Sequence, residues 1–403
     1  MNQLRLRAVF MRGGTSKAVM FRAADLPAER ELWAPIFLGA IGSPDPNGRQ
    51  LDGMGGGISS LSKICVVGPP TRAEADVDYT FAQVSVKEAL VDYSGNCGNM
   101  SSAVGPFAID ERLVAVVEEA GQATVRIYNT NTRKVIVARF PLDDGRAAVD
   151  GEFVLSGVAG TGAPVRLDFL EPGGAGTGKL LPTGNAADTL EVDGPRGIEV
   201  SMVDAANPCV FVPADALDAS GVEMPDELEA DGALLSRLEA MRIAASLRMG
   251  IARTATEAAR IPSIPKVAMV APARPSRTLA GERLAAEDAD VTVRMISIGQ
   301  PHRAVPLTGA MCLAVASRIE GSVVNRLVRP SASPGDPVRI AQPSGLTVVS
   351  ATVKRRRDRG CDEWFAESAT VYRTARRLME GWVFVRASAL PENLRSALSV
   401  GRK

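Results

Sequence analysis

The sequence is poor in the residue on which many metal centres and hydrolytic sites depend. It contains a single histidine, His302, in a chain of 403 residues. One histidine excludes a multi-histidine metal centre, and it argues against a Ser-His-Asp triad, whose base is a histidine. We therefore predict no metal site of the histidine-rich kind.

Cysteine is also sparse, and the spacing of the five cysteines is irregular. They are an odd number, far apart, and no two form a CxxC pair: Cys65, Cys97, Cys209, Cys312 and Cys361. This pattern argues against a disulfide framework and against a structural zinc site. Because free thiols persist in a reducing compartment, we expect a cytoplasmic protein.

Excess charge and long apolar runs are missing as well. Lys and Arg total 46 and Asp and Glu total 46, so no global field favours nucleic acid or an anionic membrane as a partner. No run of about 18 apolar residues suggests a membrane span, and the first residues do not resemble a signal peptide. An anionic substrate would have to be held by local groups.

Short β-branched runs separated by Gly, Pro and Asp dominate what is present, and they predict strands. No regular helices alternate with them, which argues against a doubly wound parallel sheet. Two Ala-rich runs, Met100–Ile109 and Ala310–Ile319, predict buried central helices, and Asp231 predicts the cap of a third helix through Ala245. Examples of the predicted strands are Leu4–Phe10, Ala18–Phe21, Ile64–Val67, Thr124–Tyr128, Val135–Phe140, Val200–Val203, Val210–Val212, Leu346–Val353, Thr370–Tyr372 and Trp382–Val385.

A weak internal repeat relates the two halves of the chain. Val9–Leu26 aligns without gaps to Val200–Leu217, and each copy has the pattern of a strand, a tight turn and a second strand. Each copy is followed by one of the two Ala-rich runs. The simplest interpretation is two similar α+β domains with a ligand site in the cleft between them. Chance similarity between two short alternating patterns is the alternative.

The segment Ser94–Gly105, SGNCGNMSSAVG, contains the strongest candidate site. Cys97 lies immediately before a predicted helix, whose first-turn amides attract anions and favour a thiolate. Gly98 allows close approach of a ligand to the backbone. The segment therefore offers a carboxylate cradle together with a thiol acid or base. A buried structural cysteine beside a glycine turn is the alternative.

A second segment, DGMGGGISSLSK, places Lys63 where a Gly-rich loop meets an apolar strand. Partial burial of a lysine there would lower its pKa toward the range of a general base. The alternative is a lysine whose charge reaches solvent from a strand end. In the segment MRGGTSK, Arg12 suits carboxylate recognition, although an ordinary surface hairpin fits equally. Thr308 and Gly309 open the second predicted central helix, and His302 nearby either contacts a ligand or caps a turn.

Two further motifs resemble binding sites but lack the required context. GGAGTGK, ending at Lys179, is similar to a phosphate-binding loop, yet Leu180 replaces the required Ser or Thr and Pro182 interrupts the helix that should follow. The basic run KRRRDR, from Lys354, is read as the solvated tip of a hairpin, because no aromatic platform or second basic cluster accompanies it.

Taken together, the motifs resemble the PrpF-like family across essentially the whole chain. The first half contains MRGGTSK, GSPDP, LDGMGG with SSLSK, VDY and GNCGNMSSAVGPFA, and the second half contains LLPTGN, LRMG, IPKVAMVAP, EGSVVN and RLMEGWVFV. The resemblance implies the diaminopimelate-epimerase-like α+β fold, with two pseudo-symmetric domains that each wrap a mostly antiparallel sheet around a central helix. We set these domains at residues 1–185 and 186–385, with a tail at 386–403.

The resemblance also implies isomerisation of a small unsaturated polycarboxylate without metal or cofactor. Relatives act in 2-methylaconitate cis–trans isomerisation, 4-oxalomesaconate tautomerisation or double-bond migration, and methylitaconate isomerisation. The family's lysine and cysteine positions fall on Lys63 and Cys97. The predicted substrate-binding residues are Arg12, Thr15, Ser16, Ser59, Ser60, Asn96, Gly98, Asn99, Met100, Thr308 and Gly309.

Two rival hypotheses remain open from the sequence. An accessory protein that partners a dehydratase would keep the fold but exchange no proton. An epimerase of the same fold would use two cysteines, but the residue that aligns with Cys97 in the second half is Pro306, which is neither acid nor base. The sequence does not select the substrate, and a homodimer is the default expectation because it is the commonest soluble oligomer.

Overall fold

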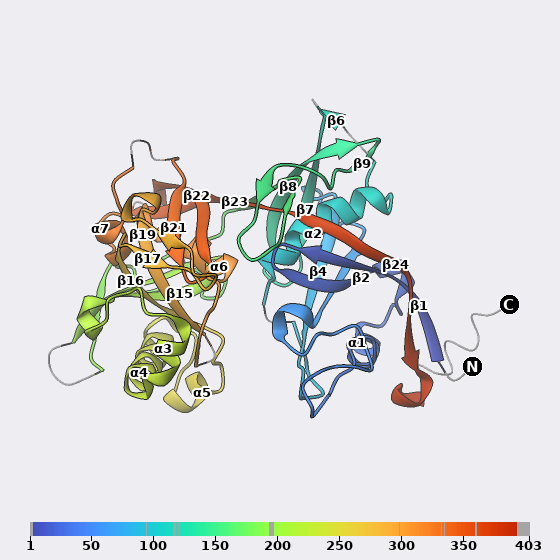
Figure 1. The fold of residues 1–403 in the computed structure, drawn as a ribbon, viewed down its shortest axis with the longest axis horizontal. Helices are drawn as coiled ribbons and strands as arrows, with labels where there is room; N and C mark the ends of the chain where they lie inside the picture. Colours follow the sequence, from blue (N-terminus) through green and yellow to red (C-terminus); the bar gives the residue numbers. More distant parts are fainter. Residues whose placement is uncertain are drawn as a thin grey trace. The chain divides into compact units, whose positions relative to one another are not determined.

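The computed structural model describes residues 3–93, 95–115, 118–119, 121–192, 197–297, 299–331, 333, 335–358 and 361–392 (Figure 1). The chain divides into two compact units. Unit 1 takes in the described residues of Met1–Leu167 and Arg373–Lys403, and unit 2 is Asp168–Tyr372.

The domain boundaries differ from those predicted. We placed residues up to 385 in the second half, but the chain returns to the first unit at Arg373. The reason is strand pairing, because the last long strand aligns with the first, from Gln3 opposite Arg386 to Gly13 opposite Ala375. The pairing of two strands so distant in sequence leaves no local signal in either strand. The predicted boundary near residue 185 and the predicted tail therefore followed sequence order alone.

Unit 1 is built on a mixed sheet in which the strand order is β24-β1-β2-β3-β4-β7-β8. The long strands are β1 (Gln3–Gly13), β2 (Ser16–Arg22), β3 (Lys63–Gly68), β4 (Val77–Val84), β7 (Gln122–Asn129), β8 (Lys134–Asp143) and β24 (Ala375–Arg386). Strand β12 (Val165–Leu170) begins in unit 1 and ends in unit 2. The short strands are β5 (Val91–Asp92), β6 (Glu118–Glu119), β9 (Arg146–Ala147), β10 (Phe153–Val154) and β11 (Thr161–Gly162).

Unit 2 repeats this sheet with the order β13-β14-β15-β16-β19-β21-β22-β23. Its strands are β13 (Asp188–Leu190), β14 (Ile198–Ala205), β15 (Asn207–Pro213), β16 (Lys266–Pro272), β17 (Ser276–Arg277), β18 (Arg283–Leu284), β19 (Val291–Ser297), β20 (Gln300–Pro301), β21 (Val338–Gln342), β22 (Gly345–Asp358) and β23 (Cys361–Arg373). All ten segments predicted as strands lie within strands.

The strand directions establish the pseudo-symmetry that the weak repeat suggested. From β24 to β8 in unit 1 the neighbouring pairs are antiparallel, antiparallel, parallel, antiparallel, parallel and antiparallel. From β13 to β22 in unit 2 the same directions follow in the same order. Each sheet is thus mostly antiparallel, as predicted, and the aligned segments of the repeat form the hairpins β1–β2 and β14–β15.

Each sheet packs against an inner and an outer helix. The inner helices are α2 (Gly98–Asp110) in unit 1 and α6 (Leu307–Ser317) in unit 2, where the two Ala-rich runs predicted them, and every residue of α6 is buried. A helix without a polar face must be surrounded by protein. In agreement, α2 contacts strands β1, β2, β3, β7, β8 and β24 (Figure 1).

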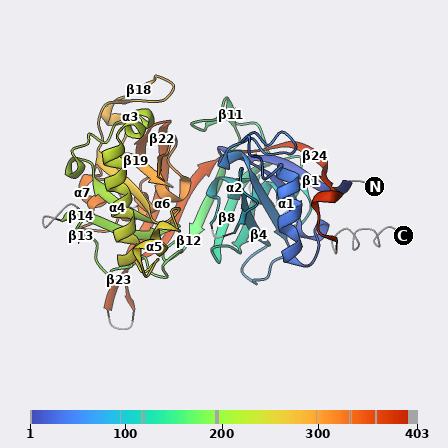
Figure 2. The same ribbon diagram turned by 90° about the horizontal axis from the view of Figure 1, so that it is seen from below.

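The outer helices cover the opposite face of each sheet. Helix α1 (Trp33–Ile41) shares a core with β1, β2 and β3, and α4 (Gly232–Arg248) shares one with β14, β15 and β16 (Figure 2). Asp231 caps α4, as predicted, by accepting the Leu234 amide at 2.9 Å. The other helices are α3 (Pro225–Ala230), α5 (Ala255–Ala259), α7 (Val323–Leu327) and the short 3-10 turns Ala23–Asp25, Arg30–Leu32, Ser59–Leu61, Asp215–Leu217, Ala286–Asp288 and Ala387–Ala389.

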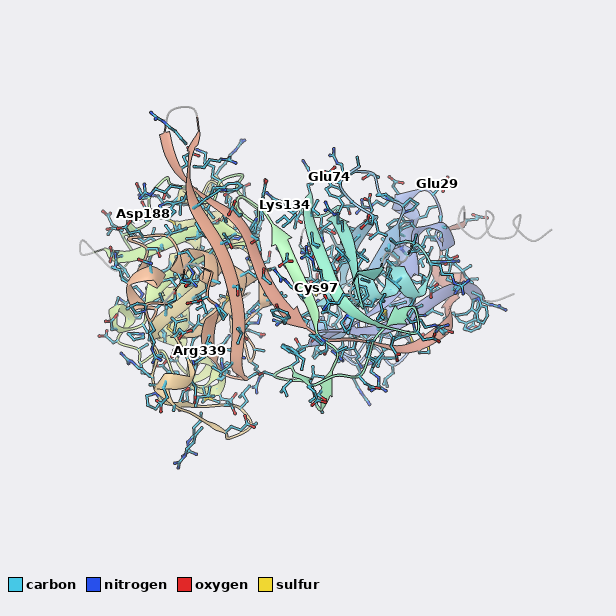
Figure 3. The ribbon with its side chains drawn as sticks, turned by 90° about the horizontal axis from the view of Figure 1, so that it is seen from above. Glu29, Glu74, Cys97, Lys134, Asp188 and Arg339 are labelled. Atoms are coloured by element: carbon cyan, nitrogen blue, oxygen red, sulfur yellow. The ribbon has the colours of Figure 1, made fainter. Side chains whose placement is uncertain are left out.

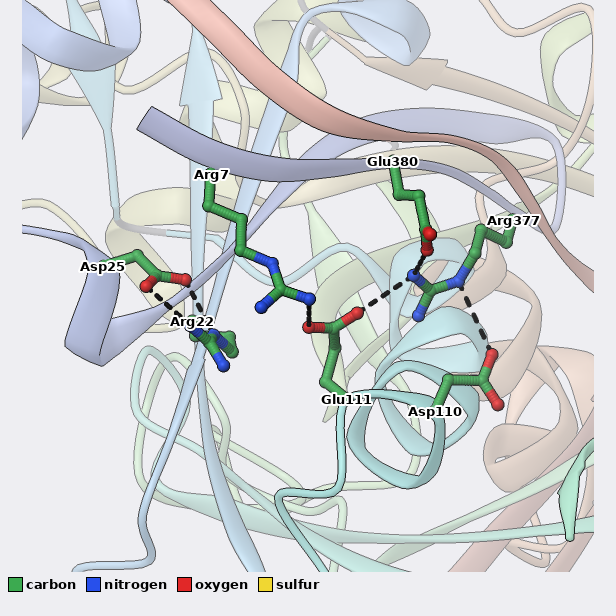
Figure 4. A network of polar contacts seen from close by, with 7 residues as sticks. All are labelled: Arg7, Arg22, Asp25, Asp110, Glu111, Arg377 and Glu380. Atoms are coloured by element: carbon green, nitrogen blue, oxygen red, sulfur yellow. Dashed lines mark hydrogen bonds and ion pairs between the residues drawn. The ribbon is translucent and has the colours of Figure 1, made fainter. Parts of the chain in front are cut away.

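An ion-pair network fixes the C-terminal end of α2 to the sheet (Figure 4). Glu111, the residue that ends the helix, contacts Arg7 of β1 at 3.1 Å and Arg377 of β24 at 2.9 Å. Arg377 also approaches Asp110 at 3.6 Å and Glu380 at 2.7 Å. Positive groups at a helix C-terminus are favourable, and here they hold the helix that carries Cys97 at its other end.

No helix in the described ranges is long and apolar enough to cross a lipid bilayer.

Candidate functional site

The candidate site in unit 1 lies on the sheet face that points toward α2. The strand register places Ala18 of β2 beside Lys63 of β3, and Lys63 beside Gln83 of β4. Ser16 lies two residues before Ala18, so its side chain is on the same face. Gly13, opposite Ser16, faces α2 so closely that an added Cβ would lie 2.8 Å from the Asn99 carbonyl oxygen.

Lys63 is the first residue of β3, and its amine is held in one orientation. The side chain is 7% exposed, and its Nζ donates to Gln83 Oε1 at 2.6 Å. The Nζ also lies 5.0 Å from the centre of the Phe81 ring. Gln83 is fixed in turn, because its Nε2 donates to the carbonyls of Ser59 at 3.0 Å and Ser62 at 2.9 Å. A buried, oriented amine at a strand end is suited to proton transfer.

The Gly-rich loop before Lys63 is organised by the buried side chain of Gln50. Its Oε1 accepts from the Ser62 hydroxyl at 2.7 Å and from the Gly57 amide at 2.9 Å, while its Nε2 donates to Ser43 Oγ at 2.8 Å. Asp45 accepts the Gln50 amide at 2.6 Å. The hydrogen bonds of Gln50 therefore connect the GSPDP motif with the Gly-rich loop that precedes Lys63.

Cys97 is the N-cap residue of α2, and its side chain is half-buried (Figure 3). Its Sγ lies 3.9 Å from Ser16 Oγ. The first helical bond is the Ser101 amide to the Cys97 carbonyl at 3.0 Å. The amides of Gly98, Asn99 and Met100 consequently have no partner within the helix, which is the arrangement that binds anions at helix N-termini.

Cys97 differs from the other cysteines whose side chains the structure describes. Cys65, Cys209 and Cys312 are buried. Burial raises the pKa of the Cys65 and Cys312 thiols, so these two remain protonated at neutral pH. Among the four, Cys97 alone combines accessibility with a helix N-terminus. The side chain of Cys361 lies outside the described part of the chain.

A polar network joins the β1–β2 turn to the start of α2. Asn99 Nδ2 donates to Thr15 Oγ1 at 3.1 Å, and Arg373 Nε donates to Asn99 Oδ1 at 3.2 Å. Arg373 is 8% exposed, and burial lowers its pKa to about 10. The guanidinium stays charged at neutral pH and brings a buried positive charge to the end of α2 at which an anion would bind.

Asn96 is fixed from the β7–β8 turn. Asn129 Nδ2 donates to Asn96 Oδ1 at 2.8 Å. Two residues later Asn131 Nδ2 donates to the carbonyls of Tyr93 at 2.7 Å and Phe81 at 2.9 Å. Hydrogen bonds from Asn129 and Asn131 thus fix Asn96 and Tyr93 in the segment that leads into α2. The side-chain oxygen of Asn96 is therefore already bonded within the protein.

The structure gives several predicted binding residues other contacts. Arg12 Nη1 donates to the carbonyls of Gly14 at 3.0 Å and Thr374 at 2.9 Å, and its neighbour in the strand, Gly13, faces α2, so Arg12 projects from the opposite face. Burial and the charge of Arg376 lower the pKa of Arg12. Ser59 is exposed, and it reaches Lys63 only indirectly, through its backbone carbonyl and Gln83.

Ser60 is partly exposed, and Met100 is fully buried, so any contact from Met100 would come from its backbone amide. The structure therefore gathers Cys97, Ser16, Thr15 and Asn99 around the start of α2 in unit 1, and it places Lys63 on the sheet face that points toward this helix. Whether the predicted binding residues contact a substrate stays a prediction.

Thr308 and Gly309 lie in the first turn of α6 in unit 2, after the N-cap residue Pro306. Gly309 packs on β19, where an added Cβ would lie 2.4 Å from the Met295 sulfur. The second helix start is thus formed as predicted, but a proline occupies the place that Cys97 has in unit 1.

Two residues of the unit 1 site were missed from the sequence. Gln83 is a polar residue within the apolar strand FAQV, and Arg373 begins the segment RTARR before the final strand. An isolated polar residue on the inward face of a strand is the signal that would have pointed to Gln83. Nothing local connects Arg373 with Asn99, which lies 274 residues away.

The two excluded motifs have structural roles. In the GGAGTGK loop the amides of Gly176 and Thr177 donate to Asp204 Oδ2 at 2.8 and 2.6 Å, so the loop binds a carboxylate of its own chain. The basic run belongs to the hairpin β22–β23, as predicted for its described residues, and Arg355 stacks on Trp364 at 4.5 Å. Among the residues described, no group of three or more His, Cys, Asp or Glu side chains is arranged to hold a metal ion.

Comparison with known proteins first defines the fold. A solved structure of a probable proline racemase from Agrobacterium radiobacter is similar with a TM-score of 0.50 and 11% identity, covering 93% of this chain and 92% of that one. At such identity the similarity concerns the fold alone. The protein thus has the racemase and epimerase type of α+β fold, as predicted.

The family follows from closer relatives. A family model described as PrpF protein matches residues 3–386. The 3-methylitaconate isomerase of Eubacterium barkeri is 41% identical over 96% of this chain and 99% of its own, and the 2-methyl-aconitate isomerase of Shewanella oneidensis is 39% identical over 95% and 97%. A crystal structure of methylitaconate-delta-isomerase has a TM-score of 0.84 at 41% identity, covering 97% of this chain and 98% of that one. The chain belongs to the PrpF family.

Proposed function

We propose that this protein is an isomerase that shifts an allylic proton in a small unsaturated polycarboxylate. The observation that carries the proposal is Lys63, a buried amine oriented by Gln83 at 2.6 Å, on the sheet face that points toward the N-terminus of α2. The names of its relatives support the substrate class, which includes 3-methylitaconate, 2-methylaconitate and, for a 38% identical relative in Pseudomonas putida, 4-oxalomesaconate.

In the proposed mechanism, the amides of Gly98, Asn99 and Met100 bind one carboxylate of the substrate at the helix start. Lys63 accepts a proton from the carbon next to the C=C bond, leaving a dienolate. The helix amides and the charge of Arg373 stabilise the negative charge that develops. Return of the proton to another carbon moves the double bond, and return after rotation gives the other geometric isomer.

In this proposal Cys97 delivers or orients that second proton. Its Sγ is 3.9 Å from the Ser16 hydroxyl, so the thiol and the hydroxyl adjoin the same helix start as the amides. If Cys97 is the donor, replacing it with alanine stops isomerisation but leaves substrate exchange with solvent at the carbon that Lys63 deprotonates. If it only shapes the pocket, both reactions persist.

The test is proton NMR in D₂O with trans-aconitate, 2-methylaconitate, methylitaconate and 4-oxalomesaconate. We expect enzyme-dependent deuterium incorporation at an allylic carbon, or a new vinyl signal, with at least one of them. Lys63→Met should lower the rate about 10²–10⁴-fold, the usual contribution of a general base. The matched control is Lys87→Met, which removes an exposed lysine and should retain activity.

The other outcomes separate the rival functions. Exchange at the α-carbon of an amino acid would identify an epimerase, although Pro306 stands where its second cysteine would be. No exchange with any substrate would favour an accessory protein. Near-normal turnover by Lys63→Met would disprove the role of Lys63. A homodimer and a cytoplasmic location also remain predictions, which sedimentation and fractionation of cells can test.

A further inference from the structure

Strand β24 forms a long and apolar edge of the unit 1 sheet. Among the described residues it has a strand register with β1 alone, and that register runs along its whole length (Figure 1). Four large apolar side chains on this strand are between 40% and 55% exposed: Leu378, Met379, Trp382 and Phe384. Unpaired backbone groups beside apolar side chains readily accept another strand, and native proteins usually protect such edges. The edge at β24 therefore indicates an interface.

The corresponding edge of unit 2 is protected in the way that β24 is not. Strand β13 takes the place of β24 in the second sheet, but it has three residues, of which only Thr189 is exposed. Asp188 of this strand accepts from the hydroxyl of Thr183 at 2.6 Å and from Asn185 Nδ2 at 2.9 Å. A short strand and an inward-pointing charge both discourage pairing with another chain. The same fold thus shields one edge and leaves its counterpart open.

The two aromatic side chains of the open edge project from one face of the sheet. Val383 and Val385 pack into the core shared with α1, so Trp382 and Phe384 leave from the opposite face. Arg5 of β1 stacks on Trp382, with its Cζ 3.9 Å from the ring centre. The ring is therefore held in place while 51% of the residue stays exposed. Ordered, accessible aromatics of this kind are enriched among the residues that dominate protein interfaces.

The aromatic end of β24 is remote in the chain from unit 2. The chain returns to unit 1 at Arg373, and a strand rises about 3.3 Å per residue, so Trp382 and Phe384 lie roughly 30 Å along the strand from that crossing. Beside Phe384 the surface has a hollow of about 560 Å³, whose lining includes Leu38 and Leu51. All these residues belong to unit 1.

The sequence of this edge is complementary to itself. Two copies of β24 that pair antiparallel around a twofold axis at Val383 bring Trp382 of each copy opposite Phe384 of the other. The same register sets Glu380 opposite Arg386. An axis one residue earlier would set Glu380 opposite Phe384, and an axis one residue later would set Trp382 opposite Arg386. Because opposite charges and pairs of aromatics stabilise antiparallel strands, charge and apolar character select the same register.

The charged residues of this register are accessible. The side chain of Glu380 is 68% exposed and that of Arg386 is 66% exposed. Each makes an ion pair within its own chain, Glu380 with Arg377 at 2.7 Å and Arg386 with Asp52 at 3.1 Å. A carboxylate has about four acceptor sites and a guanidinium five donors, so both groups retain capacity for a further partner.

We propose that two copies of this protein associate through their β24 strands, antiparallel and around a twofold axis at Val383. The two sheets then continue into one another in the order β1-β24-β24-β1. Trp382 of each copy packs beside Phe384 of the other, at the hollow described above, and ion pairs between Glu380 and Arg386 lie on both sides of the aromatic centre. This proposal is independent of the proposed function.

Sedimentation equilibrium of the full-length protein over a wide range of concentrations tests the interface. We expect a wild-type dimer, and we expect Trp382→Glu to raise its dissociation constant at least about 100-fold, because each substitution acts twice across a twofold axis. The matched control is Val154→Glu, which places the same charge at a 69% exposed apolar residue of β10 and should leave the dimer unchanged. Circular dichroism verifies that each variant is folded.

Charge reversal tests the register itself. Glu380→Arg and Arg386→Glu, made singly, place like charges opposite each other and should each weaken the dimer about tenfold. The double variant restores opposite charges and should recover most of the wild-type affinity. This recovery depends on direct contact between the two positions, which a general effect on folding would not produce.

A wild-type protein that stays monomeric at every concentration would overturn the proposal, because another segment or another protein would then have to cover the edge. A dimer that Trp382→Glu leaves intact would do the same by placing the interface elsewhere. A double charge reversal that associates no better than the single variants would disprove the register at Val383.

Discussion

Lys63 and Gln83 form the pair on which the proposed chemistry depends most directly. Gln83 Oε1 accepts from Lys63 Nζ at 2.6 Å, while its amide nitrogen is fixed by two backbone carbonyls of the Ser59–Ser62 segment. Because the side-chain nitrogen of Gln83 is already bonded to these carbonyls, only its oxygen faces the lysine. Gln83 therefore sets the direction in which the Lys63 amine points. It is a positioning residue rather than a group that contacts the substrate.

Replacing Gln83 by leucine should therefore impair catalysis more than binding. We expect kcat to fall about 10–100-fold with KM nearly unchanged, because a misplaced base loses rate while the carboxylate-binding amides remain. Gln122→Leu, at an exposed position on β7, is the control and should keep both constants. Steady-state kinetics on the substrate identified by NMR would check this, and a rise in KM alone would show that Gln83 contacts the substrate instead.

Residues of the site differ in how far the sequence revealed them. Lys63 and Cys97 lie in glycine-rich motifs at the ends of apolar runs, and such junctions are visible in one dimension. Gln83 and Arg373 act on residues that lie 20 and 274 positions away, so only the folded chain identifies them. Arg12 lies in a motif that suggested carboxylate binding, yet its guanidinium bonds two backbone carbonyls of its own unit.

Among the elements, the β1–β2 turn contacts the start of α2 so closely that a side chain at Gly14 would meet Asn99. Gly14 has φ of +53°, and a Cβ there would lie 2.4 Å from Asn99 Oδ1. Gly145, in the turn between β8 and β9, has φ of +70° with nothing within 4 Å of an added Cβ. The two glycines thus share a backbone requirement but differ in what surrounds them.

A comparison of Gly14→Ala with Gly145→Ala separates two effects. Both substitutions strain the backbone, but only the one at Gly14 displaces the side chain of Asn99. Both should lose about 1–2 kcal/mol of unfolding free energy, because each forces alanine into the left-handed region. Only Gly14→Ala should also reduce kcat/KM, by at least about tenfold, since Asn99 must move from the start of α2. Equal activities in the two variants would show that the contact between turn and helix is dispensable.

The GGAGTGK loop shows how an element can imitate a binding motif. Asp204 is fully buried, and its Oδ2 accepts the amides of Gly176 and Thr177 and the Thr177 hydroxyl, the last at 2.8 Å. A ring of glycine-rich amides around an anion is the chemistry of a phosphate loop, satisfied here by a side chain of β14. The sequence argued against nucleotide binding by this loop, and the structure shows that a carboxylate of the same chain, which the sequence did not reveal, accepts the loop amides.

Asp204→Ala should accordingly destabilise the protein and leave nucleotide binding absent. We expect a loss of about 2–4 kcal/mol in the free energy of unfolding, because three donors lose their shared acceptor. Asp226→Ala, which removes one partner of an exposed ion pair with Arg303, should cost less than about 1 kcal/mol. Denaturant titration measures both, and ATP binding by either protein would contradict the assignment of the loop.

At the scale of the whole molecule, His302 makes stability depend on pH. Its pKa falls from an ordinary 6.5 to about 4 in the folded protein because burial disfavours the charged ring. Between these values the unfolded chain binds a proton that the folded chain does not, so the free energy of unfolding decreases as the pH is lowered. The contribution is complete above pH 6.5 and is lost by about pH 4.

The expected loss is up to about 3 kcal/mol, since each pKa unit corresponds to about 1.4 kcal/mol. Other groups also titrate in this range, so the measurement compares the wild type with His302→Gln. Urea unfolding from pH 7 to pH 4 should show a smaller decrease for the variant. Parallel curves for the two proteins would mean that His302 is protonated as readily in the folded state as in the unfolded chain.

The sequence by itself determined the elements and the class of this protein. Periodicity located ten strand segments and the two buried helices, because alternation and uniform apolarity are local consequences of what each segment must bury. The motifs around Lys63 and Cys97, with the family resemblance, indicated an isomerase.

The tertiary structure alone decided what depends on pairing between distant strands. It returned Arg373 to unit 1, brought Gln83 into hydrogen-bond contact with Lys63, and filled the GGAGTGK loop with the side chain of Asp204. Strand register carries no signature in one dimension, since a match between two strands is fixed by packing and turns across the whole sheet rather than by either strand.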